Sequence, residues 1–539
     1  MEIQKKTDKS LISLLAAVIL AGLSWAAMIP MWQTPDEQAH FAQAQDYAAV
    51  GYRPNPGMST SHDIVISEKL LGTFRDERGN NKFTYHPEFR LPYSNQVNGF
   101  DEEEIVKLPL EMRSVFLIVE ATGYPPAYYW YIALVNKLIW GQDLIARLFV
   151  SRLATVLISA VGVLGVYGLA RQVFVWRTSA LAAAGLWAFM PMRQFAGSGV
   201  TSDALMNAVY PLAVLFLIKL ALAPSRKIFW LTMFSIGAAM AVKLQSVFLI
   251  PMLIAALVIA GRTKIGLGKL EKIVNKLVIG LICITFSVMI LGHIRTLASR
   301  FPQIFGYLFL PEIADFSDLY SRPTVVEYVK VIAVELYQQV LPWYFGVYRW
   351  LSLTLPIWVY RIIKVILLVS AAGWGFGLLK KESGVIRWKQ AGMVVLSALI
   401  YAGGLLGWNF FYWKSHGFSL GIQGRYFFPN LAEHMILLMG GLILVAGARF
   451  RKIIVFLAVL GMVIFSWYSW LFVSSSYFDN ANIYTFFLQA GQYKPWFFKW
   501  PFLPGVVGLG LISSGWFLWE FGVELFNKEQ KTENKKQKT

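Results

Sequence analysis

The sequence predicts an all-α protein that crosses a membrane many times. Hydrophobic residues make up 56% of the 539 residues and charged residues only 15%, and the mean hydropathy is +0.52. A soluble domain of ordinary composition carries about a quarter charged residues. Apolar windows of about 20 residues, the length that crosses about 30 Å of hydrocarbon, recur along the chain. These observations exclude an ordinary soluble protein.

We expect about twelve transmembrane helices. The expected spans are residues 11–31, 146–170, 178–196, 203–222, 228–242, 246–261, 273–292, 355–379, 391–409, 427–447, 453–473 and 502–525.

The net charge of +18 follows the membrane topology and does not indicate a nucleic-acid partner. Lys and Arg gather before the first span, in alternate short loops and in the lysine-rich C-terminal tail. Such residues concentrate on the cytoplasmic side of membrane proteins. We therefore expect a bacterial cytoplasmic membrane protein with both termini in the cytoplasm and the first loop outside.

This orientation divides the chain into three parts. Residues 1–10 form a cytoplasmic N-terminus, residues 11–525 a membrane domain, and residues 526–539 a basic cytoplasmic tail. The first span reads as an anchor because no small-residue cleavage site follows it. The membrane domain includes two large external loops, 32–145 and 293–354, and loops of this length are functional or disordered. A single cysteine rules out an internal disulfide.

The first external loop begins with a helix-start signal. Thr34 can cap a helix with Pro35 at its first position and Glu37 at its third, which is the capping-box pattern. We expect this helix to end at Gly51.

Beyond Gly51 the loop is expected to be irregular over residues 51–100 and helical over 102–120 and 125–140. The last of these helices is short and rich in aromatic residues, so an interfacial position fits it better than a membrane span. The sequence leaves both positions open.

The segment TPDEQAH, Thr34–His40, places two carboxylates and an imidazole directly after the first span. Asp36 and Glu37 are adjacent, and His40 lies one helical turn after Asp36. Ionisable groups held against a bilayer are costly and mark functional sites by default. We expect a site on the external face.

Four more segments follow in order. They are YPPAYYW, LIARLFVSRL, PMRQFAGSGVTSDALMNA at the outer end of the third span, and QGRYFFP entering the tenth. Together with TPDEQAH, their order and shared external location resemble the GT-C superfamily of integral-membrane glycosyltransferases. The sequence looks most similar to a bacterial family of predicted membrane proteins of unknown function within it. The similarity covers about residues 11–450.

The resemblance implies an activity. GT-C enzymes pass a sugar from a polyprenyl-phosphate donor, usually with inversion, to an acceptor on the non-cytoplasmic side, and the acceptor can be a glycan, a lipid or a protein. Their essential acid matches Asp36, with Glu37 as its neighbour, and a second acid in the next external loop matches Asp203. Asp203 and His40 would position the acceptor or a metal. Members differ in metal use, so a divalent cation, Mg²⁺ or Mn²⁺ held by Asp36 and Glu37, stays open.

The resemblance also implies a cationic side chain for the donor phosphate. Arg425 in QGRYFFP, followed by Tyr426, is the first candidate, and Lys243 and Arg193 are further basic residues near the outer side. The chemistry supports these residue types. A carboxylate can take the proton of the attacking hydroxyl, and an arginine offers a planar fork that keeps its charge and fits phosphate oxygens.

Each candidate also has a structural interpretation. Asp36 at a helix N-terminus would contribute about 0.3 to 1 kcal/mol through the helix dipole, and Asp203 at the start of a span would be a good cap residue. Glu37 can satisfy the capping box alone, His40 can make a plain hydrogen bond, and Arg425 can anchor a helix at the interface. The rival function is a transporter or flippase for a lipid-linked saccharide, which would hold its site near the middle of the membrane.

Overall fold

The computed structural model describes residues 9–51, 59–76, 79–91, 100–118, 124–262, 325–380, 384–416, 419, 421–478 and 482–536. Within this part of the chain almost all regular structure is helical, which confirms the all-α class. The described strands form two short antiparallel pairs, β1 (Thr60–Ser61) with β2 (Phe116–Ile118) and β3 (Val347–Tyr348) with β4 (Leu353–Thr354).

Eight helical segments in the described residues are long and apolar enough to cross a membrane. They contain α2 (Lys9–Met28), α7 (Leu144–Val173), α10 (Ser202–Leu222), α12 (Leu249–Arg262), α17 (Ile357–Lys380), α18 (Trp388–His416), α19 (Leu431–Tyr477) and α21 (Phe502–Lys536). The chain is therefore a multi-pass membrane protein.

The structure gives eight such segments where we expected twelve spans, and one reason is a fusion. The expected span 453–473 lies in α19, and the expected span 427–447 begins in η4 (Gly424–Asn430) and continues into α19. Gly447 leaves the helical path there, with φ 60° and ψ −177°, so that two helices meet at a kink. The expected span 273–292 and residues 293–324 of the second external loop lie outside the described residues.

Two other expected spans are not among these eight segments, because one is interrupted and the other is a helix of only 15 residues. The span 178–196 is divided into α8 (Arg177–Ala188) and α9 (Pro191–Gly197), because Pro191 lacks the N–H that would continue the first helix and starts a new one. The span 228–242 is α11 (Arg226–Met240), which has 15 residues.

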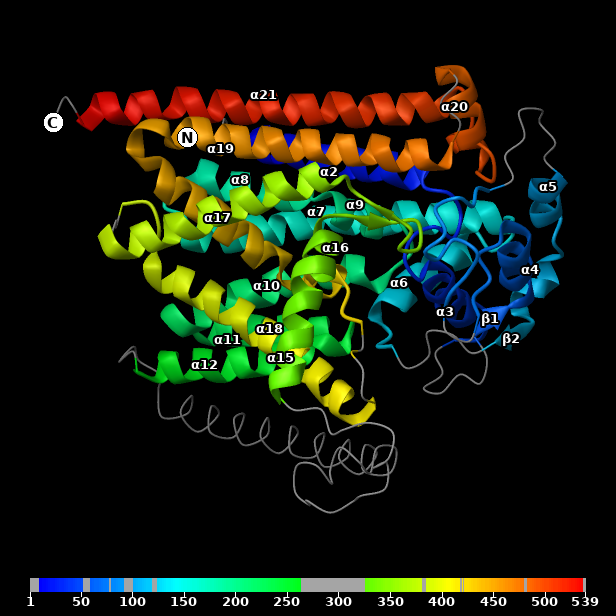
Figure 1. The fold of residues 1–539 in the computed structure, drawn as a ribbon, viewed down its shortest axis with the longest axis horizontal. Coiled ribbons are helices and arrows are strands. Elements are labelled where there is room, and N and C mark those ends of the chain that lie inside the picture. Colours follow the sequence, from blue (N-terminus) through cyan, green and yellow to red (C-terminus); the bar gives the residue numbers. More distant parts are fainter. Residues whose placement is uncertain are drawn as a thin grey trace, which may run out of the picture.

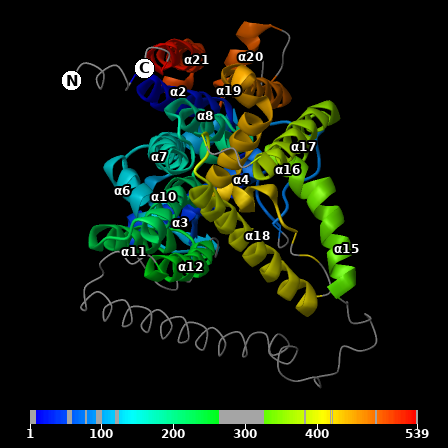
Figure 2. The ribbon, with the colours of Figure 1, turned by 90° about the vertical axis from the view of Figure 1, so that its left-hand side faces the viewer.

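The membrane helices form one bundle whose long axis is horizontal in Figure 1. The first and last helices run antiparallel, since the Ser10 hydroxyl donates to Glu520 O at 3.1 Å and the Ser24 hydroxyl donates to Val506 O at 3.2 Å. Helices α7 and α10 pack on each other, with α2 and α8 beside α7 and with α11 and α12 beside α10 (Figure 2).

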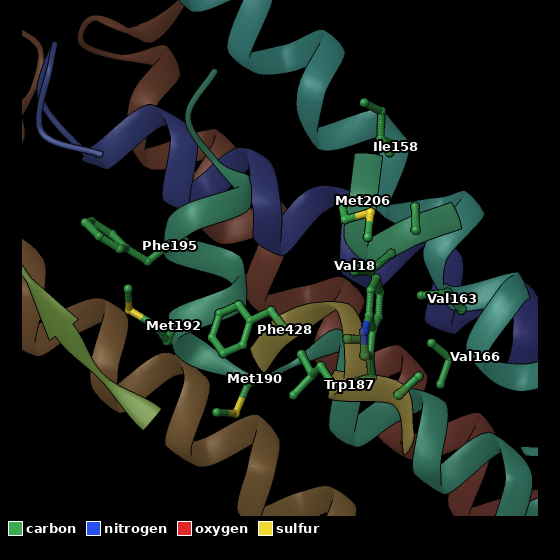
Figure 3. Packing of buried hydrophobic residues seen from close by; sticks show 14 of the residues in the cluster. Val18, Ile158, Val163, Val166, Trp187, Met190, Met192, Phe195, Met206 and Phe428 are labelled. Atoms are coloured by element: carbon green, nitrogen blue, oxygen red, sulfur yellow. The ribbon is translucent and has the colours of Figure 1, made fainter. Parts of the chain in front are cut away.

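The core of the bundle includes a tight contact between α7 and α8 (Figure 3). A Cβ atom at Gly162 would collide with the indole of Trp187, so only glycine lets the two helices approach this closely. The ring of Trp187 lies beside Val163 and Val166 (Figure 3). Small residues at such contacts are the usual means of packing membrane helices.

Basic side chains from several loops meet at one end of the bundle. The Arg387 guanidinium donates to Arg171 O at 2.7 Å and to Phe174 O at 3.0 Å, and Arg177 pairs with Glu524 at 2.7 Å. The alternate loops that we expect in the cytoplasm therefore share one end, and the start of α2 lies there too. The segment of the first loop that contains α3 (Glu37–Val50) lies at the other end (Figure 1).

The first loop is more ordered than its sequence predicts. Helix α4 (His62–Leu71) lies where we expected irregular structure. The prediction of one helix over 102–120 is wrong. Helix α5 (Phe100–Val106) ends before Pro109, and a short 3-10 turn, η1 (Leu110–Ser114), follows. Helix α6 (Ala127–Leu138) lies within the expected range 125–140 and has 12 residues.

The remaining described helical elements are α15 (Val325–Glu335), η3 (Leu336–Val340), α16 (Leu341–Phe345), η2 (Leu244–Phe248), η4 (Gly424–Asn430), α20 (Ile483–Ala490) and η5 (Trp496–Phe498).

Candidate functional site

Asp36 lies at the N-terminus of α3 with both carboxylate oxygens bound by arginines. Its Oδ2 is 2.5 Å from Arg425 Nη2, and its Oδ1 is 3.3 Å from Arg75 Nη1. Its backbone is left-handed at φ 55° and ψ 21°. Aspartate tolerates this region better than most residues, and such conformations gather at functional sites. The carboxylate is 37% exposed, so a ligand can reach it.

Arg425 connects the two acids that we expected to act together. It reaches Asp36 with one terminal nitrogen, while Nη1 lies 3.9 Å from Asp203 Oδ2 and Nε donates to Gln423 Oε1 at 2.8 Å. The preceding Gly424 packs so tightly on the backbone of Tyr344 that any Cβ there would collide with it. This contact fixes η4 and therefore the direction in which Arg425 leaves the backbone.

Asp203 and Lys243 form the second ion pair of the cluster. Asp203 is the second residue of α10, and its N–H donates to the Thr201 hydroxyl of the helix cap at 3.2 Å. Lys243 comes from the junction between α11 and η2 and pairs with Asp203 Oδ1. We define the charge cluster as Asp36, Asp203, Arg75, Lys243 and Arg425. It holds three cations and two carboxylates.

The electrostatics of Asp36 favour the anion. Burial would raise the pKa of its carboxyl, but the charge of Arg425, its hydrogen bond and the charge of Arg75 outweigh burial and hold the pKa well below its ordinary value. Asp36 is therefore a carboxylate at any physiological pH.

His40 lies next to the charge cluster and is neutral. Burial lowers its pKa to about 4, although Asp36 acts in the opposite direction. Its Nδ1 is 2.7 Å from the hydroxyl of Tyr129, and its ring centroid is 5.7 Å from that of Tyr124. Together with Tyr124, which is 41% exposed, the imidazole gives the cluster an aromatic wall.

Glu37 does not join Asp36, which corrects our expectation of a catalytic or metal-sharing pair. Its side chain is fully buried, and its two oxygens accept from Arg152 at 2.6 and 2.5 Å, while Val200 N–H donates to it at 3.1 Å. The left-handed turn at Asp36 sends the two adjacent carboxylates in different directions. The capping box is also wrong, because α3 begins at Glu37 and its cap residue is Asp36, which makes no side-chain cap bond.

Arg193 also lies outside the charge cluster. Its guanidinium stacks on Trp187 at 4.1 Å and donates to Ser159 Oγ at 3.3 Å and to Ala188 O at 3.1 Å. These contacts fix the corner between α8 and α9, so the expected phosphate role is not supported. Tyr426 stays beside the site, with its ring 5.7 Å from the Arg425 guanidinium carbon.

The structure does not bring Asp36 and Glu37 together as the ligands of one divalent cation, because Glu37 is bound to Arg152. The described residues contain no group of three or more His, Cys, Asp or Glu side chains that could hold a metal. The two acids of the charge cluster are each paired with a cationic side chain instead.

The sequence reading missed Arg75 and the buried arginines of α7. Arg75 lies in the loop after α4, and nothing local distinguishes it from other loop arginines. The signal for the α7 pair was present, since Arg147 and Arg152 interrupt the apolar segment LIARLFVSRL and a buried arginine needs an acidic partner. Arg147 pairs with Asp63 at 2.8 Å.

The family of the chain follows from a direct match. Residues 19–433 match the model of a family described as "Predicted membrane protein (DUF2142)". The chain belongs to the DUF2142 family. The match includes all five residues of the charge cluster, from Asp36 to Arg425.

This DUF2142 member is also similar to two solved structures of ArnT from Cupriavidus metallidurans, one bound to undecaprenyl phosphate and one in the apo state. For each, the sequence identity is 14%, the match covers 95% of this chain and 77% of ArnT, and the TM-score is 0.38. No curated protein matches the sequence.

Proposed function

We propose that this protein is a membrane glycosyltransferase of GT-C type. It transfers a sugar from a polyprenyl-phosphate donor to an acceptor hydroxyl at the outer face of the bacterial cytoplasmic membrane. The observation that carries the proposal is the charge cluster, in which five charged side chains from five separate segments meet around an accessible carboxylate.

The charge of the cluster suits a phosphodiester. Three cations and two carboxylates leave one positive charge, which a sugar phosphodiester with one negative charge would neutralise. Arg425 offers the planar fork that fits two phosphate oxygens, and Lys243 and Arg75 offer further donors. The leaving phosphate is already charged, so it requires cationic stabilisation and no general acid.

The ion pairs of Asp36 suggest how the donor activates the site. A carboxylate held by two arginines is a weak base, because its pKa is so low. A donor phosphate would compete for Arg425 and Arg75, and each arginine that leaves Asp36 lets its pKa rise. Asp36 then takes the proton of the acceptor hydroxyl, whose oxygen bonds to the anomeric carbon. The bond from that carbon to the phosphate oxygen breaks, and the phosphate leaves with the electron pair.

The position of the cluster supports a transferase over a transporter. Asp36 follows α2, Asp203 begins α10, Lys243 follows α11, and Arg425 precedes α19. All four therefore lie at helix ends, whereas a site for alternating access lies near the middle of the membrane.

An apolar groove beside η4 suits the lipid chain of the donor. It has a volume of about 450 Å³ and lies between η3, α16, α17 and α19. Phe427, two residues after Arg425, forms part of its wall, and Leu341, Trp374 and Leu438 line it further. An isoprenoid chain in this groove would bring its phosphate towards the segment that carries Arg425.

The test is a comparison of lipids and surface glycans, by mass spectrometry, from cells with and without the gene. We expect one sugar to be absent without the gene and restored by the wild-type gene. The variant Asp36→Asn should be produced at normal levels and fail to restore the sugar, because the amide cannot accept the proton. Restoration by Asp36→Asn would overturn the proposal.

A further inference from the structure

A second polar cluster lies inside the helix bundle, apart from the charge cluster. The Glu433 carboxylate of α19 accepts at Oε1 from Asn430 Nδ2 at 2.7 Å and from Ser397 Oγ at 3.0 Å. Glu433 and Asn430 are 0% exposed and Ser397 is 1% exposed. The three side chains come from α18, the end of η4 and the first turn of α19.

Two oxygen atoms of this cluster have no hydrogen-bond partner in the part of the chain that the structure describes. They are Glu433 Oε2 and Asn430 Oδ1. Among the described residues no lysine or arginine pairs with Glu433, and Arg425, on the same short segment as Asn430, is bound to Asp36. A carboxylate buried in a membrane protein without a counter-charge is costly, and so is each unmet acceptor.

The described residues around Glu433 offer oxygen atoms and no positive charge. Tyr210 interacts with Ser397 and packs its ring edge-on against Tyr401 at 5.6 Å. The Tyr401 hydroxyl donates to Tyr426 O at 2.6 Å. The neighbouring His434 points away from the cluster, because its Nδ1 bonds the Tyr344 hydroxyl at 2.9 Å.

We propose that Glu433, Asn430 and Ser397 bind one monovalent alkali cation. A single cation would satisfy both unmet oxygens and neutralise the carboxylate. Oxygen ligands suit hard cations. One carboxylate balances one positive charge, whereas a divalent ion would leave a net positive charge in the core. The ion would lie where η4 meets α19, on the segment that also carries Arg425.

The ion would join three elements that otherwise meet through a few hydrogen bonds. It links α18 to the end of η4 and to the start of α19, and η4 also carries Arg425. The bond from Tyr401 to Tyr426 O supports the same segment. Cation binding therefore stabilises the fold around Arg425, and it does so whether or not the protein transfers a sugar.

The test is thermal unfolding of the detergent-purified full chain in NaCl, KCl or choline chloride at equal ionic strength. We expect the midpoint to rise in a saturable way by several degrees with Na⁺ or K⁺ and not with choline. Glu433→Gln should abolish the rise. The matched control Glu524→Gln should keep it, since Glu524 is also a buried acid of a membrane helix but is paired with Arg177.

Equal midpoints of the wild-type protein in NaCl, KCl and choline chloride at every concentration would overturn the inference and assign the cluster to a proton or to water. This comparison needs no variant, so it decides the matter even if Glu433→Gln fails to fold. Equilibrium binding of ²²Na⁺ or of ⁸⁶Rb⁺ to the wild-type chain should in addition saturate at one ion per chain.

Discussion

At the scale of single residues, the candidate site is a set of ion pairs that share one excess positive charge. Arg425 is shared between Asp36 at 2.5 Å and Asp203 at 3.9 Å, and Lys243 holds Asp203 from the other side. Ion pairs of this kind cost little to exchange for a phosphate, because one charged hydrogen bond replaces another. Asp36 therefore competes with the donor phosphate for Arg425, although Asp36 and Arg425 take part in the same proposed reaction.

This competition predicts opposite effects on phosphate binding from the two members of the pair. We expect Arg425→Gln to weaken binding of undecaprenyl phosphate by about 10- to 100-fold, the value of a hydrogen bond to a charged group. Asp36→Asn should bind it at least as tightly as the wild type, because the carboxylate no longer holds the arginine. The measurement is the ligand-induced rise in unfolding temperature, with undecaprenol, which lacks the phosphate, as the control. Equal weakening by both variants would contradict the competition.

The neutral state of His40 predicts a pH dependence of stability. Its folded pKa of about 4 lies below the ordinary 6.5, so the unfolded chain binds the proton more readily. The stability that this neutral imidazole contributes is present above pH 6.5 and is lost as the pH falls towards 4. At pH 5 the loss is about 2 kcal/mol.

We expect His40→Gln to show a smaller fall in unfolding temperature between pH 7 and pH 5 than the wild type. The comparison of slopes removes any constant effect of the substitution. Parallel curves for the two proteins would mean that His40 does not titrate as the structure indicates.

At the scale of elements, α7 holds the first loop to the bundle through two buried ion pairs. Arg147 binds Asp63 of α4, and five residues later Arg152 binds Glu37 of α3. Arg152 also donates to the carbonyls of Ile29 at 2.6 Å and Pro30 at 2.8 Å, which follow the end of α2. One guanidinium therefore satisfies a buried acid and the free carbonyls after a helix end.

We expect Arg152→Met to destabilise the protein by about 3 to 5 kcal/mol, because it leaves Glu37 buried without a counter-charge. The double variant with Glu37→Gln should recover part of this loss. The control is Lys107→Met, which removes an exposed pair with Glu103 and should change stability by less than about 1 kcal/mol. Denaturant unfolding in detergent measures the free energy of unfolding of each variant. Similar losses of stability for Arg152→Met and Lys107→Met would refute the role of the buried pair.

At the scale of the whole molecule, the two ends of the bundle differ in composition. One end gathers Arg171, Arg177 and Arg387, and the other carries the first loop and the charge cluster. By the positive-inside rule we expect the first end to face the cytoplasm and the site to face outward.

This orientation predicts different labelling of two exposed lysines replaced by cysteine, in a chain with Cys283→Ala. A membrane-impermeant maleimide should label Lys107→Cys, on the first loop, in intact cells. It should label Lys380→Cys, at the end of α17, only after the membrane is permeabilised. Labelling in the reverse order would invert the topology and place the site in the cytoplasm.

Several members of the site could be predicted from the sequence because helix ends are visible in it. Asp36, Asp203, Lys243 and Arg425 all adjoin apolar segments, and charged residues at that position are rare enough to be noticed. Arg75 could not be found, since a loop arginine carries no local signal. Glu37 was assigned to the site because it follows Asp36, and Arg193 because it lies near Asp203.

The sequence by itself determined the class of the protein and the end of the bundle at which the charged residues lie, because hydrophobic length and charge bias act locally along the chain. Only the tertiary structure decided which side chains meet. The side chain of Glu37 turns away from that of Asp36, because it binds Arg152, 115 residues away, and because the backbone of Asp36 is left-handed. Asp36 instead meets Arg425, 389 residues away, because the packing of α16 on η4 directs that arginine towards α3.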